Sequence, residues 1–506
     1  MNDRNRIINL YIPILLVLIS FFWKYAYIGQ RDICLDEPFS LFHAQQGITH
    51  FFDVLKESPD LPLFLFILHA WIKIFGNDPE SVRIIPLIFH AFTPLFIYLT
   101  GKRFFGFIAG LTAAVIFILS KFNFYQALEV RTYSLFILAT AASLYYFLIY
   151  KDDLKNKKIL VWLIASNVIL VHSHYFGWFV IFIQSLIGIF YIKGIKSFLR
   201  IQIPIFASVI SFIPLVPFFI SQFGRSSQGT WVQPPGDWEY LDYLYHFLNH
   251  KEGFTTTVYI SIAGLALAAY FIFYQKKKVA FNKNIIPVFV WWFVPYTIMF
   301  LVSSKIPMFI VKYTLFNTVG YYIFVAALIG FICQFNKYSH LVASFIMVAY
   351  IALHLKILPS DYSYREVKKS VETVKKYQFS DDKRIILIYP AWDDLGFAYY
   401  YDRNWFNDPN SFTTYSTKHN IFPIYNLLHA TEIIKQHQGM RVIMFKDTHS
   451  NNENERFFEY LKSSLTEVAR DSFPQSFIVG VYDPIIKETA INRINSKFQP
   501  TIKELQ

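Results

Sequence analysis

The chain has 506 residues, of which 54% are hydrophobic, 20% aromatic and only 16% charged, and its formal net charge is +12. Soluble proteins carry about 25% charged residues, so this composition excludes an ordinary soluble protein as well as a disordered or collagen-like chain. Residues 361–506 hold 19 basic and 19 acidic residues, so the whole positive surplus lies in residues 1–360. The numbers indicate a membrane protein with a neutral, polar tail.

Apolar runs follow one another from the N-terminus, and most approach the roughly 20 residues that a membrane-spanning helix needs. They are residues 7–28, 62–76, 83–100, 106–124, 132–150, 159–175, 176–192, 201–220, 255–274, 285–302, 315–334 and 340–358. The first run lacks the cleavage site of a signal peptide, so we interpret it as an anchor helix. The expected fold is an α-helical multi-pass membrane bundle with about 11–13 transmembrane helices.

The basic residues predict the orientation, because cytoplasmic loops are enriched in lysine and arginine. With the N-terminus inside, the inner loops hold 16 basic and three acidic residues. Lys102 and Arg103 come inside only if residues 62–100 cross an odd number of times, so one of the two apolar runs there is re-entrant or interfacial. Eleven crossings result. This topology accounts for the net charge, and a nucleic-acid partner is not expected.

From about residue 361 onward, polar and charged residues replace the long apolar runs. Short β-type runs at residues 384–389, 441–445 and 477–482 are separated by helical patterns. We predict a transmembrane domain over residues 1–360, with an outer loop 29–61, and a small extracytoplasmic α/β domain over residues 361–506. Cys34 and Cys333 fall on opposite predicted sides of the membrane, so a disulfide framework is not expected.

Acidic residues bracket the first outer loop. Asp36 and Glu37 come soon after the first apolar run, and Asp60 stands just before the second. One interpretation is a helix start, with Asp36 as the cap and Pro38 in the first turn. The other is a carboxylate that acts as a general base or as a metal ligand. The spacing alone leaves both open.

Two further groups lie at predicted outer turns. Glu129 and Arg131 form either an interfacial pair or part of a polar cavity, since a charge at the bilayer centre costs about 2.5–3.5 kcal/mol. His172 and His174 are two residues apart and do not share a helix face, which favours hydrogen bonding within the bundle over metal binding.

Lysines in the predicted outer loops are unexpected, because basic residues are enriched in cytoplasmic loops. Lys305 and Lys312 either snorkel or, together with Arg131, hold a phosphate. A phosphate at this face indicates a lipid-linked substrate. The aromatic-rich loop 221–254 reads as an interfacial segment or as a surface on which sugars stack.

In this order, the pieces resemble the GT-C superfamily of membrane glycosyltransferases that use polyprenyl-phosphate sugars, especially protein O-mannosyltransferases and the aminoarabinose transferases of lipid A. The resemblance covers about residues 7–335. The early Asp-Glu pair of the family is matched by Asp36 and Glu37, and the resemblance implies that the aspartate is the catalytic base or lies at the catalytic centre.

The remaining motifs of the family follow in the same order. Its Glu-x-Arg-x-Tyr motif is matched by residues 129–133, its His-Tyr-Phe-Gly motif by residues 174–177, and a later Arg-Tyr by Lys312-Tyr313. One departure is Leu61, which stands where aminoarabinose transferases place a lysine and argues against their particular donor.

The resemblance therefore implies an inverting glycosyltransferase that moves one sugar, a hexose or a pentose, from a polyprenyl phosphate to a lipid, glycan or protein acceptor, in a bacterial plasma membrane. The expected catalytic residues are Asp36 and Glu37, and a divalent metal held by Asp36 and Asp60 is an alternative. The expected substrate-binding residues are Asp60, Glu129, Arg131, Tyr133, His174, Tyr175, Lys305, Lys312 and Tyr313.

Rival functions are a transporter or flippase of lipid-linked glycans, a ligase or polymerase that transfers whole oligosaccharides, and a non-enzymatic sensor. A transporter would place its charges near the bilayer midplane and carry internal repeats, whereas the candidate charges here gather at one face.

Overall fold

A computed structural model describes the chain apart from residues 1–2, 59, 192–193, 228–231, 249–281, 333–343, 345–347, 349–350, 352–364, 379–382, 449–452, 474–475 and 485–506. The chain divides into two compact units. Unit 1 comprises residues 1–28 and 47–362, and unit 2 comprises residues 29–46 and 363–506. The predicted outer loop 29–61 is thus shared between the units, and its first part, with Asp36 and Glu37, groups with the tail.

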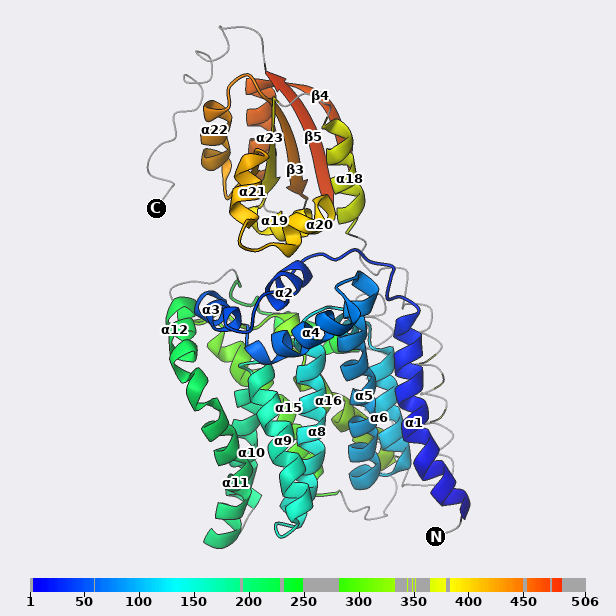
Figure 1. Cartoon of the computed structure of the whole chain (residues 1–506). Helices are drawn as coiled ribbons and strands as arrows, with labels where there is room; N and C mark the ends of the chain where they lie inside the picture. The colour runs from blue at the N-terminus through cyan, green and yellow to red at the C-terminus, as the bar shows by residue number, and fades with distance from the viewer. Residues whose placement is uncertain are drawn as a thin grey trace. The chain divides into compact units, whose positions relative to one another are not determined.

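Unit 1 is helical throughout its described part (Figure 1). Its α-helices are α1 (Asp3–Tyr25), α3 (His50–Glu57), α4 (Pro62–Phe75), α5 (Pro79–Phe105), α6 (Phe107–Leu119), α7 (Lys121–Ala127), α8 (Tyr133–Asp152), α9 (Lys157–Ser173), α10 (Gly177–Tyr191), α11 (Ile195–Phe212), α12 (Val216–Ser227), α13 (Glu239–Phe247), α15 (Ile285–Val302) and α16 (Asn317–Ile332). Two 3₁₀ helices, η1 (Ile213–Leu215) and η3 (Val311–Thr314), join them.

Four stretches of described helix are long and apolar enough to cross a membrane: α5, α8, the run Ile195–Arg225 and α15. The bent pair of α6 and α7 adds a fifth if it counts as one span. The apolar run predicted at residues 106–124 is broken because Ser120 caps α7, its hydroxyl accepting the N–H of Asn123, and the two helices meet at 65°. The predicted total of 11–13 stays a prediction, and residues 255–274 and most of 340–358 lie outside the described residues.

Helix α4 bears on the prediction that one of the two apolar runs in residues 62–100 does not cross the membrane. Its 14 residues span about 21 Å, short of the hydrocarbon core of about 30 Å. Figure 1 shows α4 running across the end of the bundle rather than along it, whereas α5 runs along the bundle. Of the two apolar runs, the first is therefore the one that has the dimensions of an interfacial or re-entrant helix.

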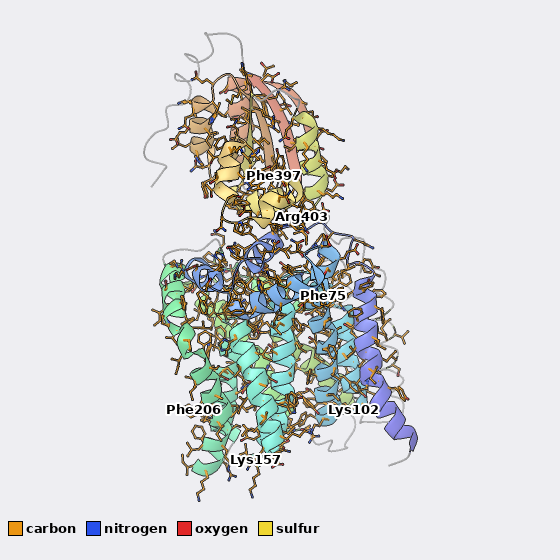
Figure 2. The ribbon with its side chains drawn as sticks, viewed as in Figure 1. Phe75, Lys102, Lys157, Phe206, Phe397 and Arg403 are labelled. Atoms are coloured by element: carbon orange, nitrogen blue, oxygen red, sulfur yellow. The ribbon has the colours of Figure 1, made fainter. Side chains whose placement is uncertain are left out.

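Two lysines of the predicted inner loops lie at one end of unit 1. Figure 2 shows Lys102 and Lys157 at the same end of the bundle and Phe75, at the end of α4, at the opposite end. Lys102 and Arg103 fall in the last turn of α5, where cations are favourable to the helix dipole.

The helices of unit 1 pack through small residues and through hydrogen bonds between polar side chains. Both are typical of helices that associate in a membrane, where burial of apolar surface gives little preference for one neighbouring helix over another. A Cβ atom at Gly101 of α5 would lie 2.6 Å from the Cα atom of Gly110 in α6, so only glycine permits this approach. Helices α8, α9 and α10 are joined by a closed ring of hydrogen bonds of 2.7 Å among Ser143, Asn167 and Gln184.

Unit 2 is an α/β domain built on a five-stranded sheet of order β2-β1-β3-β5-β4. The strands are β1 (Arg384–Tyr389), β2 (Ile421–Pro423), β3 (Arg441–Asp447), β4 (Leu465–Ser472) and β5 (Phe477–Pro484). Strand β1 pairs in parallel with β2 and β3, β5 pairs antiparallel with β3, and β4 pairs antiparallel with β5; Ile386 of β1 lies opposite Ile443 of β3. Strands β1 and β3 are buried along almost their whole length, as parallel strands covered on both faces are.

Helices cover both faces of this sheet. Its α-helices are α2 (Glu37–Ala44), α18 (Val367–Tyr377), α19 (Asp394–Tyr401), α20 (Arg403–Asn407), α21 (Phe412–Lys418), α22 (Leu427–Gln436) and α23 (Glu453–Ser464), with the 3₁₀ helix η4 (Ala391–Asp393). One apolar core joins α22 and α23 to Ile385 and Met444. On the other face Phe397 of α19 packs on Phe445, and Figure 1 shows α18 and α22 on opposite sides of the sheet.

Candidate functional site

An ion pair between Asp60 and Arg131 organises the candidate site of unit 1. Nη2 of Arg131 lies 2.7 Å from Oδ1 of Asp60, and the two side chains are only 12% and 21% exposed. The second carboxylate oxygen of Asp60 accepts a hydrogen bond of 2.9 Å from the Ser58 hydroxyl. Asp60 precedes α4 and Arg131 precedes α8, so the pair fixes two turns that are 71 residues apart in the chain. Two of the predicted substrate-binding residues are thus brought together.

The turn that carries Arg131 is held by hydrogen bonds. The N–H of Arg131 donates to the carbonyl of Glu129 at 2.7 Å, and the Thr132 hydroxyl donates to the carbonyl of Ser173 at 2.9 Å. Ser173 is the last residue of α9, so residues 129–132 are tied to the turn that contains His174. Glu129 itself is half-buried.

His174 sits in the turn between α9 and α10 within a box of aromatic rings. Its ring stacks on Phe136, with centroids 4.9 Å apart, and contacts Tyr133 at 6.0 Å and Tyr313 at 5.8 Å. The sequence forms this turn because Gly177 starts α10 against α9: a Cβ there would lie 2.7 Å from the carbonyl oxygen of Leu170. The predicted His-Tyr-Phe-Gly motif is therefore an architectural unit, with glycine as the residue that lets α10 begin so close to α9.

The hydrogen bonding of His174 defines its tautomer. Its Nδ1 accepts the N–H of Phe176 at 3.2 Å, so the proton of the neutral ring is on Nε2. Burial lowers the pKa of His174 to about 4, with Asp60 opposing this shift and Arg131 and Lys312 reinforcing it. The ring is neutral at pH 7 and offers Nε2–H as a donor. Asp60, Arg131 and Lys312 all lie near enough to act on it.

This pKa predicts how acid affects stability. The unfolded chain binds a proton at His174 near pH 6.5 but the folded chain only near pH 4, so the contribution of this residue is complete above pH 6.5 and falls as the pH drops toward 4. We expect the melting temperature of the wild type in detergent to fall further between pH 7 and pH 5 than that of His174→Asn, which keeps an acceptor but does not titrate. An equal fall in both proteins would contradict the assignment.

The other predicted residues of unit 1 are placed around this centre with one exception. Tyr133 is 3% exposed, and Tyr313 lies in η3 beside Lys312. Burial and the nearby Asp60 raise the pKa of Tyr175 to about 12, and its hydroxyl has no hydrogen-bond partner among the described residues. Lys305 is exposed beyond the end of α15, and its side chain makes no ion pair with a described residue. We name Asp60, Arg131, His174, Tyr175, Lys312 and Tyr313 the Arg131 cluster.

In unit 2 the Asp-Glu pair separates into two different environments. Glu37 is fully buried; its Oε2 lies 3.1 Å from Nη2 of Arg31 and accepts the N–H of Cys34 at 3.3 Å. Asp36 is half-buried at the N-cap position of α2, with Pro38 in the first turn, as the helix-start interpretation has it, but its side chain makes no capping hydrogen bond. Glu37 therefore supports the fold of the loop, while Asp36 is the acid that remains partly accessible.

Metal binding stays a prediction for Asp36 and Asp60. Within the described part of the chain, no three side chains of His, Cys, Asp or Glu gather in a way that could hold a metal ion. Both oxygens of Asp60 are already engaged, one by Arg131 and one by Ser58.

Comparison with known proteins gives a family match in sequence. The family model described as dolichyl-phosphate-mannose-protein mannosyltransferase matches residues 57–220, which include Asp60, Arg131 and His174. No curated protein matches the chain.

Comparison with solved structures extends over nearly the whole chain. ArnT from Cupriavidus metallidurans in the apo state is similar over 92% of this chain and 97% of ArnT, with a TM-score of 0.56 and 10% identity. The chain has the fold of ArnT. Together with the family match over residues 57–220, this likeness supports the resemblance inferred from the motifs. The predicted helical bundle with a small C-terminal sheet is confirmed at the level of fold.

Two more solved structures are similar in fold to this chain. ArnT from the same organism bound to undecaprenyl phosphate gives a TM-score of 0.55 at 11% identity, over 92% of this chain and 97% of that chain. The apo form of the Archaeoglobus fulgidus oligosaccharyltransferase gives 0.51 at 10% identity, over 95% of this chain and 75% of that one.

Sequence reasoning missed some of the residues that build these sites. Ser58, which holds the second oxygen of Asp60, is signalled only by its place in the Ser58-Pro59-Asp60 stretch. Tyr400, whose hydroxyl contacts the loop of Asp36, carries no sequence signal at all, because its partner is 367 residues away.

Proposed function

We propose that the chain is a membrane glycosyltransferase that transfers a single sugar from a polyprenyl-phosphate carrier to an acceptor on the extracytoplasmic face. The Arg131 cluster is the observation that carries the proposal. It sets two cations and a neutral imidazole donor, held in place by Asp60 and by aromatic rings, on a GT-C scaffold. ArnT, which has the same fold, has been crystallised with undecaprenyl phosphate.

In this proposal the Arg131 cluster binds the phosphate of the donor. A guanidinium held in one orientation by a carboxylate suits a phosphate oxygen, because it pays little entropy on binding. Lys312 adds a second positive charge, and Nε2–H of His174 adds a neutral donor. Tyr175, whose hydroxyl has no hydrogen-bond partner among the described residues, contributes a further donor to the sugar or the phosphate.

The reaction is a substitution at the anomeric carbon. Asp36 removes the proton of the acceptor hydroxyl, whose oxygen bonds to the anomeric carbon as the bond from that carbon to the phosphate oxygen breaks. The electron pair leaves with polyprenyl phosphate, and Arg131 and Lys312 stabilise the charge that develops there. Attack opposite the leaving group inverts the configuration. Glu37 has a supporting role, because its carboxylate is buried against Arg31.

A second candidate is transfer of a whole oligosaccharide. The similarity to the Archaeoglobus fulgidus oligosaccharyltransferase favours it, since the two chains share a fold over 95% of this one. The two functions differ in the size of the donor, and both require a lipid phosphate to leave.

The deciding experiment incubates the purified protein, in lipid, with a panel of radiolabelled polyprenyl-phosphate sugars and one polyprenyl-linked oligosaccharide. Release of free polyprenyl phosphate from a monosaccharide donor is expected. Release from the oligosaccharide donor alone would favour the second candidate. No release from any donor, combined with movement of labelled lipid between leaflets, would favour a flippase.

The proposed topology places the N-terminus and Arg103 in the cytoplasm and unit 2 outside, in a bacterial plasma membrane. In a background with Cys34→Ser and Cys333→Ser, it predicts that a membrane-impermeant maleimide added to intact cells labels a cysteine at exposed Lys418 but not one at exposed Arg103. Both cysteines should react after the cells are permeabilised. Labelling in the reverse order would refute the topology.

A further inference from the structure

The segment that carries Asp36 is built into unit 2. Residues 29–46 are separated from residues 363–506 by the whole helical bundle in the chain, yet the two stretches form one compact unit. Helix α2 packs against α19 of the tail. Polar and apolar contacts join residues 29–46 to residues 363–506.

Two hydrogen bonds anchor the stretch just before Asp36. The backbone N–H of Ile33, a fully buried residue, donates to Oη of Tyr400 at 2.6 Å. Oδ2 of Asp32 accepts the N–H of Lys368 at 2.8 Å, in the first turn of α18. A carboxylate at a helix N-terminus is favourable because it satisfies an otherwise unpaired N–H and faces the positive end of the helix dipole.

Apolar contacts anchor the stretch just after Asp36. The ring of Phe42 lies 5.7 Å from that of Phe406 and 5.2 Å from that of Phe412, both edge-to-face. Pro38 packs over Gly396 of α19, where a Cβ atom would lie 3.6 Å from Cγ of the proline. The loop is therefore held on both sides of the candidate base.

The backbone between these anchors is strained. Leu35, directly before Asp36, has a φ of 57°, a left-handed conformation that costs a residue with a side chain about 1–2 kcal/mol. The Leu35 side chain is 53% exposed and does not account for the conformation by its own packing. Such strain persists only where the surroundings impose it, and it collects at functional sites.

We propose that unit 2 is a positioning device for Asp36, with Tyr400 and the first turn of α18 as its two polar anchors. The proposal rests on the function given above, in which Asp36 is the base. Tyr400 and Asp32 are positioning residues, since they act on the backbone that carries Asp36 and not on the substrate. Unit 2 would thus contribute to catalysis by holding Asp36, a role that the sequence of residues 363–506 does not predict.

The test uses Cys34, which lies in the loop and is 3% exposed, as a reporter of docking. In a full-length background with Cys333→Ser, the rate of maleimide labelling at Cys34 is measured together with kcat and the KM for the donor. Tyr400→Phe and Asp32→Ala should each raise the labelling rate and lower kcat by about 10- to 100-fold, the loss expected when a reacting group is misplaced by about 1 Å. The KM for the donor should not change, because the donor cluster lies in unit 1.

Tyr401→Phe is the matched control. Its hydroxyl accepts a hydrogen bond of 2.6 Å from Gln378 and makes none with the loop, so labelling and kcat should both stay at wild-type values. Unchanged labelling in Tyr400→Phe and Asp32→Ala would overturn the docking, and raised labelling with normal kcat would overturn the positioning role. A fully active Asp36→Asn would instead refute the proposed function, while the labelling result would still report on docking.

Discussion

Replacing Asp36 by asparagine is expected to abolish sugar transfer while leaving the protein folded. Asparagine has the same shape but cannot take the proton of the acceptor, and a positioned general base contributes about 10²- to 10⁴-fold to a rate. Asp36 is half-buried and its side chain makes no capping hydrogen bond on α2, so the change does not remove a helix cap. The measurement is turnover of the labelled donor, with donor binding followed separately.

Two variants separate this effect from damage to the loop. Asp53→Asn removes an exposed acid of α3 that pairs with Lys56, and should leave turnover unchanged. Glu37→Gln should lower the thermal stability of the protein, because the buried Arg31 loses its counter-charge. Turnover of Asp36→Asn near the wild-type rate would remove Asp36 from the mechanism.

Arg131→Gln is expected to lower kcat/KM by about 10²- to 10³-fold, the usual loss when one fixed donor to developing charge is removed. The change also leaves the Asp60 carboxylate, 21% exposed, without its ion-pair partner. Stability should therefore fall as well, by about 1–3 kcal/mol. Turnover assays and thermal melts measure the two losses independently.

The double variant Asp60→Asn with Arg131→Gln distinguishes the structural share from the catalytic one. It removes both charges of the pair, so stability should recover part of the loss while activity should not. Arg103→Gln, at the exposed end of α5, is the matched control for loss of a cation and should be active. Recovery of activity in the double variant would mean that Arg131 serves only to neutralise Asp60.

The strands of unit 2 show where sequence reasoning succeeds. β1, β3 and β5 are apolar runs between polar stretches, and all three lie where the pattern predicts them. Strand β2 has only three residues and ends in Pro423, which leaves no pattern to detect. Strand β4 is an edge strand whose buried and exposed residues alternate and whose sequence is rich in charge, so its composition hides it.

The candidate site was predictable to a similar extent. The motifs around Arg131, His174 and Lys312 identify residues that cluster in unit 1: Thr132 is hydrogen-bonded to Ser173, and the ring of His174 contacts that of Tyr313. The roles of Asp36 and Glu37 could not be separated, since burial of one and not the other depends on Arg31 and on the turn between them. The attachment of residues 29–46 to the tail depends on contacts such as Ile33 with Tyr400, which have no counterpart in local sequence.

Unit 2 is formed by two stretches that are far apart in the chain, so its two parts are synthesised at different times. At about 5–20 residues per second, the residues that cover Phe42 leave the ribosome roughly 20–80 s after Phe42 itself. Throughout that interval the segment 29–46 has no tail to pack on, although Ile33, Leu41 and Phe42 are buried in the finished protein. The apolar side chains of the segment thus have no tail to pack against until translation is nearly complete, and a chain truncated before residue 363 lacks their partners altogether.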